Sequence, residues 1–415
     1  MSFSHRFLLL RQQLMINPAY ATTIRQARVV VLAQSAFIFN TTEFVPIALL
    51  TDIGVSFAMP VEQVGMMVTI YAWLVAILSL PAMLVTAQVP RKRLLLWVFA
   101  LFILGHVISV MAPSFLLLLV GRAAIALAHA IFWSITASLV VRLAPRGRQT
   151  KALGLLAMGG ALATVLGLPL GRLIGQWLGW RMTFAAIGFF ALLTALLLAW
   201  MLPKLPSKNV GSLASLPQLG RNAPLLLMYA LTVVTVTAHF SAYSYVEPYL
   251  LQINQFSANF ATLVLLVFGL SGFVASFLFG HFYERYPRVF LGAALVGLLT
   301  ALFGVTLVTG SHALWLLLAV AWGGCMTSIS LALQFQVLKL APKATDVAMA
   351  IFSGIYNVGI GGGALVGSWV IGAWGLGVVG NVGAIITLVA ILLALWGMAN
   401  HGMLPKKTAS THAKP

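Results

Sequence analysis

Long apolar stretches separated by short polar connections run through most of this chain. A helix that crosses a lipid bilayer needs about 20 predominantly apolar residues. The pattern predicts an all-α integral membrane protein with twelve transmembrane helices. Breaking the apolar stretches at charges, prolines and glycines places them at residues 29–50, 64–86, 94–111, 115–141, 152–175 and 182–202, then at 225–251, 258–282, 289–308, 313–338, 347–374 and 378–401.

Composition leads to the same class of protein. Of the 415 residues, 61% are hydrophobic and only 7% are charged, and the mean hydropathy is +1.03. Soluble domains contain roughly half apolar and a quarter charged residues. A water-soluble core cannot absorb this much apolar surface, so a soluble globular protein is excluded.

The net charge of +18 raises nucleic acid as a partner, since clusters of lysine and arginine neutralise phosphates. The basic residues, however, fall in alternate connections, and loops rich in Lys and Arg stay in the cytoplasm. We therefore expect both termini in the cytoplasm, an even number of spans and no nucleic-acid partner. The basic connections carry Arg91, Lys92 and Arg93; Arg142, Arg146, Arg148 and Lys151; Lys204, Lys208 and Arg221; Arg285 and Arg288; and Lys339 and Lys343.

The longest internal polar stretch, residues 203–223, has three prolines, three basic residues and no acid. It predicts a cytoplasmic linker between two six-helix bundles, residues 29–202 and 224–402. Residues 1–28 and 403–415 are then cytoplasmic tails.

A sequence repeat supports two equivalent bundles. Residues 142–146 (RLAPR) match residues 339–343 (KLAPK) at an offset of 197, each at the end of an even-numbered span. The same offset carries Pro90-Arg91 onto Pro287-Arg288. Two matches in equivalent loops indicate tandem duplication. Parallel six-helix halves with a substrate site between them are the architecture of the major facilitator transporters.

Three segments resemble motifs of that superfamily. Residues 280–288 resemble its loop motif of Gly, an acid and Arg, whereas the counterpart at 83–93 keeps only the basic end. Arg122, within residues 118–126 of span four, resembles the motif with a membrane-embedded arginine. Span five resembles the glycine-and-proline motif associated with antiporters, with Gly167-Leu168-Pro169 in place of the usual Gly-Pro pair. The resemblance also rests on Gly159, Gly160, Gly171 and Gly175.

Residues 37–46, 128–134 and 344–350 make the resemblance more specific. Together they look like the bacterial sugar-efflux transporters of the arabinose-export type, within the drug:proton antiporter subfamily. The resemblance implies export of sugars or analogues, such as arabinose and thiogalactosides, coupled to proton entry by alternating access. It also implies a multi-pass protein of the bacterial inner membrane. A multidrug:proton antiporter, or an importer running the same cycle, is the alternative.

Among the six acids, Glu43 lies well inside a predicted span, away from its ends. An ionisable residue there is costly unless it faces a partner or water, and by default it indicates function. A proton-coupled carrier needs a carboxylate that binds a proton from one side and releases it to the other. We expect Glu43 to have this role. A fixed ion pair, or a protonated acid hydrogen-bonded within the bundle, is the alternative.

Arg122 and His129 lie seven residues apart on span four, so they fall on nearly the same helical face, and Trp133 is one turn further. The family resemblance puts spans one and four beside the central cavity, near Glu43. The hypothesis is that Glu43 and His129 share or exchange a proton while Arg122 biases their protonation. An ordinary interhelical hydrogen bond is an equally open interpretation of His129.

On span seven, His239, Tyr243 and Glu247 recur every four residues, a spacing that suits a cavity wall. Glu247 is close to the outer end of the span, so we expect a solvated residue at the mouth of the cavity and not a proton carrier. Pockets combine apolar walls with a few placed polar groups, and sugars also stack on aromatic rings. The predicted substrate-binding residues are Asn40, Tyr71, Trp73, Trp133, His239, Tyr243, Glu247, Gln334, Tyr356 and Asn357.

Span eleven carries a glycine-rich stretch that predicts a close-packed face, because small residues let transmembrane helices approach. The stretch has a GxGxxG-like appearance, but no strand precedes it, so it does not indicate a nucleotide site. Its glycines are Gly359, Gly361, Gly362, Gly363 and Gly367.

Other chemistry is not indicated. Cys325 is the lone cysteine, so a disulfide framework and a CxxC metal or redox pair are excluded. The spans contain no HExxH, no paired catalytic aspartates and no Walker loop, so we expect neither an enzyme nor a bound metal or cofactor. A receptor is disfavoured because the chain has no sizeable soluble domain. We expect a monomer driven by the proton gradient.

Overall fold

The computed structural model describes residues 18–86, 88–145, 148–206, 216–342 and 345–404. Every regular element in these ranges is a helix. Twelve helical segments are long and apolar enough to cross a membrane. The all-α, twelve-span fold predicted from the hydrophobic pattern is therefore confirmed, whereas the sidedness of the termini stays a prediction.

The first six spans and their connections include eight α-helices and two short helical turns, η1 and η2, in the described ranges. Span one is α2, which begins at Pro18 and so extends into the predicted tail of residues 1–28. Span five combines two α-helices with a π-helical turn between them. The elements are α2 (Pro18–Phe44), η1 (Val45–Ala48), α3 (Leu50–Phe57), α4 (Val61–Val85), α5 (Arg91–Met111), α6 (Phe115–Leu143), α7 (Gln149–Leu162), η2 (Ala163–Gly167), α8 (Leu168–Leu178) and α9 (Trp180–Met201).

The second six spans follow a short helix in the linker region, α10 (Leu216–Leu219). Span seven again includes a π-helical turn, η4. The elements are α11 (Ala223–Tyr243), α12 (Val246–Pro248), η4 (Tyr249–Ile253), α13 (Ala258–Phe282), α14 (Pro287–Leu307), α15 (His312–Leu340), α16 (Thr345–Trp374), η5 (Leu376–Val378) and α17 (Val379–Asn400).

The two halves of the chain repeat one packing arrangement. Helix α5 packs against α6 and α9, as α14 packs against α15 and α17. Helix α4 packs against α6 as α13 packs against α15, and α2 packs against α7 as α11 packs against α16. Each pair maps onto its counterpart six spans later, which agrees with the duplication inferred from the sequence repeat.

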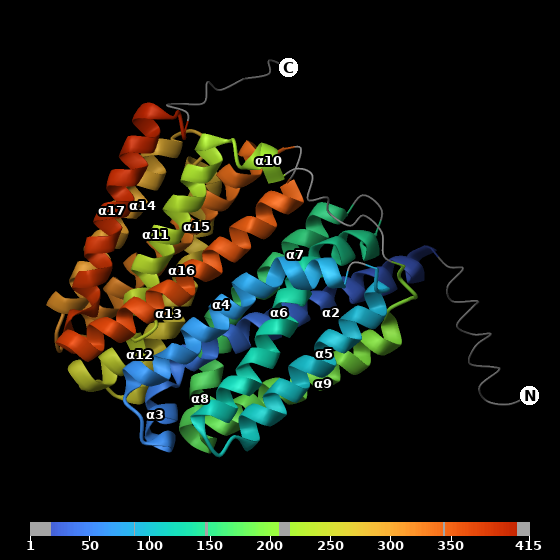
Figure 1. Cartoon of the computed structure of the whole chain (residues 1–415), viewed down its shortest axis with the longest axis horizontal. Helices are drawn as coiled ribbons and strands as arrows, with labels where there is room; N and C mark the ends of the chain where they lie inside the picture. The colour runs from blue at the N-terminus through green and yellow to red at the C-terminus, as the bar shows by residue number, and fades with distance from the viewer. Residues whose placement is uncertain (1–17, 87, 146–147, 207–215, 343–344, 405–415) are drawn as a thin grey trace, which may run out of the picture.

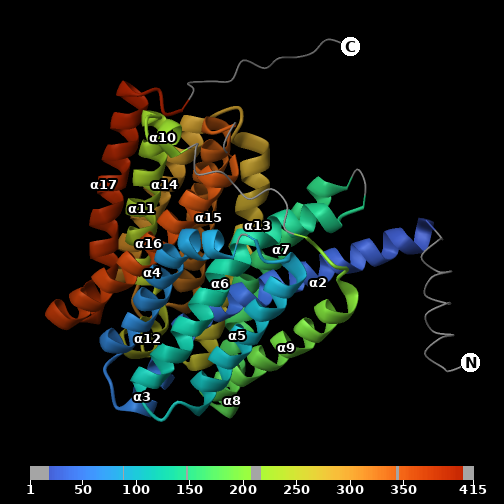
Figure 2. The same cartoon turned by 45° about the vertical axis from the view of Figure 1, so that its right-hand side comes forward.

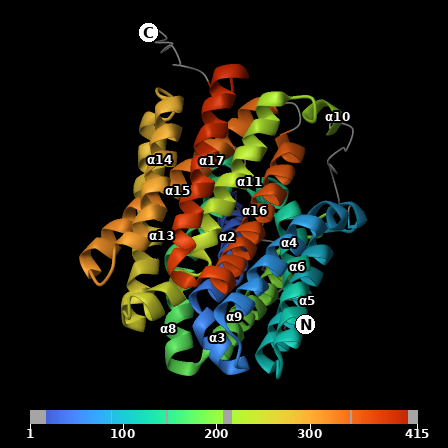
Figure 3. The same cartoon turned by 60° about the vertical axis from the view of Figure 1, so that its left-hand side comes forward.

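The halves meet where α4 packs against α16 and where η2 and α8 pack against α13. Their helices lie together at the end that carries α3, α8 and α12 and spread apart toward the end that carries α10 (Figure 1, Figure 2). Figure 3 shows α4 and α16 running side by side at the boundary. We call these two ends the α3 end and the linker end.

Polar contacts between the halves extend from the middle of the spans to the α3 end. In the middle, Nε1 of Trp73 donates to the Val358 carbonyl at 3.2 Å. Nearer the α3 end, Oγ of Ser368 donates to the Glu62 carbonyl at 2.7 Å. The halves are thus joined at the α3 end while their helices diverge toward the linker end.

Glycines allow the closest helix contacts. A Cβ at Gly363 would collide with α11 at the Thr237 carbonyl and Phe240, and one at Gly361 would collide with Trp73 on α4. A Cβ at Gly171 would likewise collide with Val45. The close-packed face predicted on span eleven is confirmed, and the glycines of span five serve the same purpose against span one.

Candidate functional site

Pro46 shapes the backbone at the end of α2. In a continuous α-helix the Thr42 carbonyl would accept from the amide of residue 46, but proline has no N–H. The helix ends at Phe44, and the Thr42 carbonyl accepts from Nη1 of Arg122 at 2.6 Å instead. The sequence therefore leaves a free carbonyl inside the membrane at the place where a buried guanidinium needs an acceptor.

Arg122 is fully buried on α6. Its guanidinium carbon lies 4.1 Å from the centroid of the Tyr71 ring, which provides a cation–π contact. Its Nε and Nη2 groups have no hydrogen-bond partner among the described residues. Buried donors without acceptors are costly, so this cation retains capacity for an anionic or polar partner.

Glu43 and His129 face one another beside this arginine. Oε2 of Glu43 lies 3.7 Å from Nε2 of His129, and the two residues are 7% and 3% exposed. The separation exceeds a hydrogen bond, and Nδ1 of His129 has no hydrogen-bond partner in the described ranges. The structure thus brings the three predicted coupling residues together with Tyr71. We call Glu43, Tyr71, Arg122 and His129 the charged cluster.

His106 provides a contrast in the same half. Its Nδ1 lies 2.8 Å from the Phe102 carbonyl and its Nε2 lies 2.8 Å from Oγ1 of Thr42. A carbonyl only accepts, so Nδ1 donates and Nε2 accepts from the hydroxyl. Both nitrogens of His106 are occupied, as expected for a histidine that holds helices together.

Asn40 and Trp133 lie next to the charged cluster. Nδ2 of Asn40 donates to the Gly160 carbonyl at 3.4 Å, and the Trp133 ring lies 6.2 Å from that of His129. A Cβ on Gly160 would contact both Asn40 and Trp133. These two predicted binding residues are partly exposed, so they can border a substrate beside Glu43.

The second half holds a group of stacked rings around His239. Tyr243 stacks on His239 at 4.7 Å between centroids and on Phe268 at 4.6 Å. Nε1 of Trp322 donates to Nδ1 of His239 at 2.9 Å. An indole N–H is only a donor, so Nδ1 is unprotonated and the neutral imidazole carries its hydrogen on Nε2. We call His239, Tyr243, Phe268 and Trp322 the aromatic box.

The charged cluster and the aromatic box lie on opposite sides of the boundary between the halves. Phe44, which follows Glu43, stacks on Phe240, which follows His239, with ring centroids 6.2 Å apart. The charged cluster and the aromatic box therefore lie at the same level on either side of this ring contact.

The remaining predicted binding residues are less closely associated with the charged cluster and the aromatic box. Trp73 is engaged in the contact between α4 and α16. Oη of Tyr356 lies 3.1 Å from Oγ of Ser330, and Nδ2 of the buried Asn357 donates to the Ser353 carbonyl while its Oδ1 has no partner in the described ranges. Gln334 is exposed on α15 and has no contact that ties it to the box.

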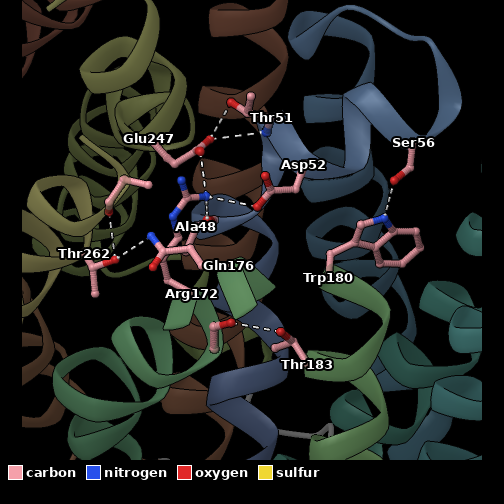
Figure 4. Close-up of polar contacts among 12 residues, drawn as sticks. Ala48, Thr51, Asp52, Ser56, Arg172, Gln176, Trp180, Thr183, Glu247 and Thr262 are labelled. Carbon is pink, nitrogen blue, oxygen red and sulfur yellow. Dashed lines mark hydrogen bonds and ion pairs between the residues drawn. The ribbon is translucent and has the colours of Figure 1, made fainter. Parts of the chain in front are cut away.

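The structure corrects the expectation for Glu247. We expected a solvated residue at the mouth of the cavity, but Glu247 is 0% exposed. Its Oε1 lies 2.6 Å from Nη1 of Arg172, and its Oε2 accepts from the amide of Thr51 at 3.2 Å and from Oγ1 of Thr51 at 2.8 Å (Figure 4). Proximity to the span end suggested water, but residues of the other half cover the carboxylate.

Arg172, on α8, is the center of this group and was missed from the sequence. It is 1% exposed, and its Nη1 also donates to the Ala48 carbonyl at 2.6 Å and to Oδ2 of Asp52 at 3.3 Å. Burial raises the pKa of the Asp52 carboxyl above its usual value, and the neighbouring Arg172 guanidinium opposes that shift. A charge inside predicted span five was the signal that could have identified Arg172.

Within the described ranges, no group of three or more His, Cys, Asp or Glu side chains is placed to hold a metal ion. The chemistry available in the charged cluster and the aromatic box is proton binding and hydrogen bonding, combined with stacking on aromatic rings.

Comparison with known proteins identifies close relatives. A family model described as Major Facilitator Superfamily matches residues 30–344, with a second match at 226–414. A "Probable sugar efflux transporter" of Mannheimia succiniciproducens is 52% identical over 378 residues, which cover 91% of this chain and 95% of that protein. A protein of the same name from Helicobacter acinonychis is 55% identical over 366 residues, covering 88% and 93%. The resemblance to sugar-efflux transporters is confirmed.

Solved structures share the fold. A bacterial homolog of the human lysosomal transporter Spinster, in an inward-facing and unoccupied conformation, gives a TM-score of 0.68 at 15% identity and covers 93% of this chain and 96% of its own. A D-xylose-proton symporter gives a TM-score of 0.73 at 13% identity, covering 93% and 98%. At these identities the likeness concerns the fold alone.

Proposed function

This chain belongs to the Major Facilitator Superfamily, and from this premise we propose that it exports sugars or sugar analogues in exchange for protons. It is a multi-pass membrane transporter and not an enzyme. The proposed cycle is alternating access, in which two halves rock around a site between them. The proposed location is the bacterial inner membrane, with the linker end toward the cytoplasm because the basic connections lie there.

The names of the relatives carry the proposed substrate class. Two proteins more than half identical to this chain over about nine tenths of its length are called sugar efflux transporters. The aromatic box is compatible with such a ligand, since a pocket for a small polar molecule combines apolar walls with a few placed polar groups. Arabinose and thiogalactosides are the substrates we propose to test.

His239 is the proposed hydrogen-bond donor to the sugar. Because Nδ1 accepts from Trp322 at 2.9 Å, the free Nε2–H is left to donate to a hydroxyl or ring oxygen. Asn357 supplies an acceptor, since its Oδ1 has no partner in the part of the chain described. Trp322 is then a positioning residue that fixes the tautomer and orientation of His239.

The charged cluster is the proposed site of proton coupling. With Glu43 ionised, its charge balances the permanent charge of Arg122; with Glu43 protonated, the cluster carries a net positive charge. His129, 3.7 Å from Glu43 and free at Nδ1, can relay the proton. The change in net charge lies beside the boundary between the halves, so it can bias which arrangement of the halves is favoured.

Exchange of sugar for protons follows if the proton and the sugar compete for the same conformation of the carrier. When Glu43 is protonated, the outward-facing carrier can return to the inward-facing state with the proton bound. Release of that proton into the cytoplasm restores the Glu43 carboxylate beside Asn40 and Trp133. A sugar entering there from the cytoplasm meets the ionised cluster. Coupling requires only that the carrier changes orientation with either the proton or the sugar bound.

The proposal is tested with purified protein in liposomes whose interior is acidified. Labelled arabinose and a labelled thiogalactoside should accumulate inside as protons leave, and a protonophore should abolish accumulation. A fluorescent multidrug substrate is measured in parallel. Accumulation of the dye without either sugar would contradict the sugar assignment and favour the multidrug:proton antiporter, and sugar accumulation that ignores the protonophore would contradict proton coupling.

A further inference from the structure

The ion pair between Arg172 and Glu247 connects the two halves at the α3 end (Figure 4). Arg172 belongs to the first half and Glu247 to the second, and every polar partner of Glu247 in the described ranges is in the first half: Arg172 and Thr51. A second contact nearby, from Nε2 of Gln176 to Oγ1 of Thr262 at 3.2 Å, also joins the halves. The α3 end cannot open without breaking these contacts.

Separating this ion pair would leave a charge without a counter-ion at a buried position. Removing one partner of a buried pair is strongly unfavourable, because the other charge remains out of water. Glu247 lies on the short helix α12, at the end of span seven, where opening would expose it to solvent. Arg172 lies deeper, on α8, and is 1% exposed. The guanidinium therefore needs another acceptor once Glu247 leaves.

Asp52 is already in position to be that acceptor. Its Oδ2 lies 3.3 Å from Nη1 of Arg172. Asp52 lies on α3 of the same half, and the Ala48 carbonyl that Arg172 also contacts lies just before it, at the end of η1. The Asp52 side chain is 38% exposed, so it retains water when the pair forms. Nε of Arg172 has no hydrogen-bond partner among the described residues and can serve a second carboxylate contact.

We propose that Arg172 exchanges Glu247 for Asp52 as its main partner when the α3 end opens, so that Glu247 is the closing acid and Asp52 the acid of the open state. Thr51 holds the closed arrangement by donating to Glu247 from both its amide and its hydroxyl. The π-helical turns η2 and η4 adjoin α8 and α12, and such turns are frequent at functional sites. The inference rests on transport by alternating access but not on the proposed sugar or on proton coupling.

The exchange predicts opposite effects for two acids whose oxygens lie 2.6 Å (Glu247) and 3.3 Å (Asp52) from Nη1 of Arg172. Glu247→Gln keeps the shape of the side chain and an acceptor for Thr51 but removes the ion pair, so the open form should gain on the order of tenfold over the closed form. Asp52→Asn leaves the closing pair intact and removes the acid of the open state. Added to Glu247→Gln, it should reverse most of that gain.

The test is a spin-label distance across the α3 end, on a Cys325→Ala background. Met111 ends α5 and Leu307 ends α14, in opposite halves, and both side chains are well exposed, at 73% and 65%. Labels at these two positions report opening without any substrate. Glu62→Gln, which removes a partly exposed acid at the same end, is the matched control, and Thr51→Val is a milder variant that removes one hydrogen bond to Glu247.

The expected result is a shift to longer distances in Glu247→Gln and a smaller shift in the same direction in Thr51→Val. Glu62→Gln should show no shift. Adding Asp52→Asn to Glu247→Gln should partly reverse the shift. Unchanged distances in both Glu247→Gln and Thr51→Val would overturn the closing role. A double variant as open as Glu247→Gln alone would overturn the exchange with Asp52. Because the readout needs no transport, a failed sugar assay would leave this result standing, and the converse also holds.

Discussion

Oε2 of Glu43 and Nε2 of His129 lie 3.7 Å apart in the first half of the protein, while both nitrogens of His106, in the same half, are within 2.8 Å of a partner. The two histidines are equally buried. They differ in whether a proton can be gained or lost without breaking a hydrogen bond. That difference is what separates a proton-relaying histidine from one that supports the fold, and it can be measured.

Substitution of the two histidines should give different phenotypes. His129→Ala should weaken the pH dependence of gradient-driven transport, because the proposed relay partner of Glu43 is removed. His106→Ala should keep the pH profile but lower stability by about 1–3 kcal/mol, because Thr42 Oγ1 and the Phe102 carbonyl lose their partner. Initial transport rates across a pH series and thermal unfolding in detergent provide the two readouts. An unaltered pH profile in His129→Ala would return that residue to a structural role.

Trp322 should affect substrate affinity more than turnover. Trp322→Phe keeps a ring in the aromatic box but removes the hydrogen bond that orients His239, so KM should rise roughly fivefold, the effect of about 1 kcal/mol, with kcat nearly unchanged. Trp315→Phe is the matched control, because Trp315 is buried on the same helix but donates to Asn254 and Val308 outside the box. Equal KM values for the two variants would remove Trp322 from the substrate site.

The glycines of α16 should differ sharply in their tolerance of a methyl group. A Cβ at Gly363 would approach the Thr237 carbonyl to 2.7 Å, whereas one at Gly372 would meet nothing within 4 Å. Gly363→Ala should therefore cost about 1–3 kcal/mol through overpacking. Gly372→Ala should be neutral or stabilising by up to about 1 kcal/mol, because alanine favours a helix. Thermal unfolding of the two variants in one detergent compares them directly, and similar midpoints would contradict the packing argument.

The sequence predicted most of the fold because each helix that crosses a lipid bilayer needs a long apolar segment. Twelve apolar segments, basic alternate connections and a repeat at a fixed offset were enough for the twelve helices and the paired halves. Glu43 and Arg122 were recognisable because a charge inside an apolar span requires an explanation. The start of α2 at Pro18 was missed, because the polar residues before residue 29 give no apolar signal for the extra helical turns.

The environment of Glu247 could not be predicted from its own span. Position near a span end suggests solvent. Only the packing of α3 and η1 against α12, together with the side chain of Arg172 from α8, reveals that Arg172 and Thr51 enclose Glu247. The partners are separated by 75 residues and by the linker, so no local pattern connects them. Trp322 was missed for the same reason, since its contact with His239 joins α15 to α11.

The central claim is that Glu43 couples sugar movement to protons, and the most direct measurement compares two modes of transport in Glu43→Gln. In liposomes, counterflow exchanges labelled for unlabelled sugar without a proton gradient, whereas accumulation into acid-loaded vesicles requires one. The account predicts that Glu43→Gln retains counterflow and loses accumulation, while the Glu62→Gln control retains both. Full gradient-driven accumulation by Glu43→Gln would contradict it.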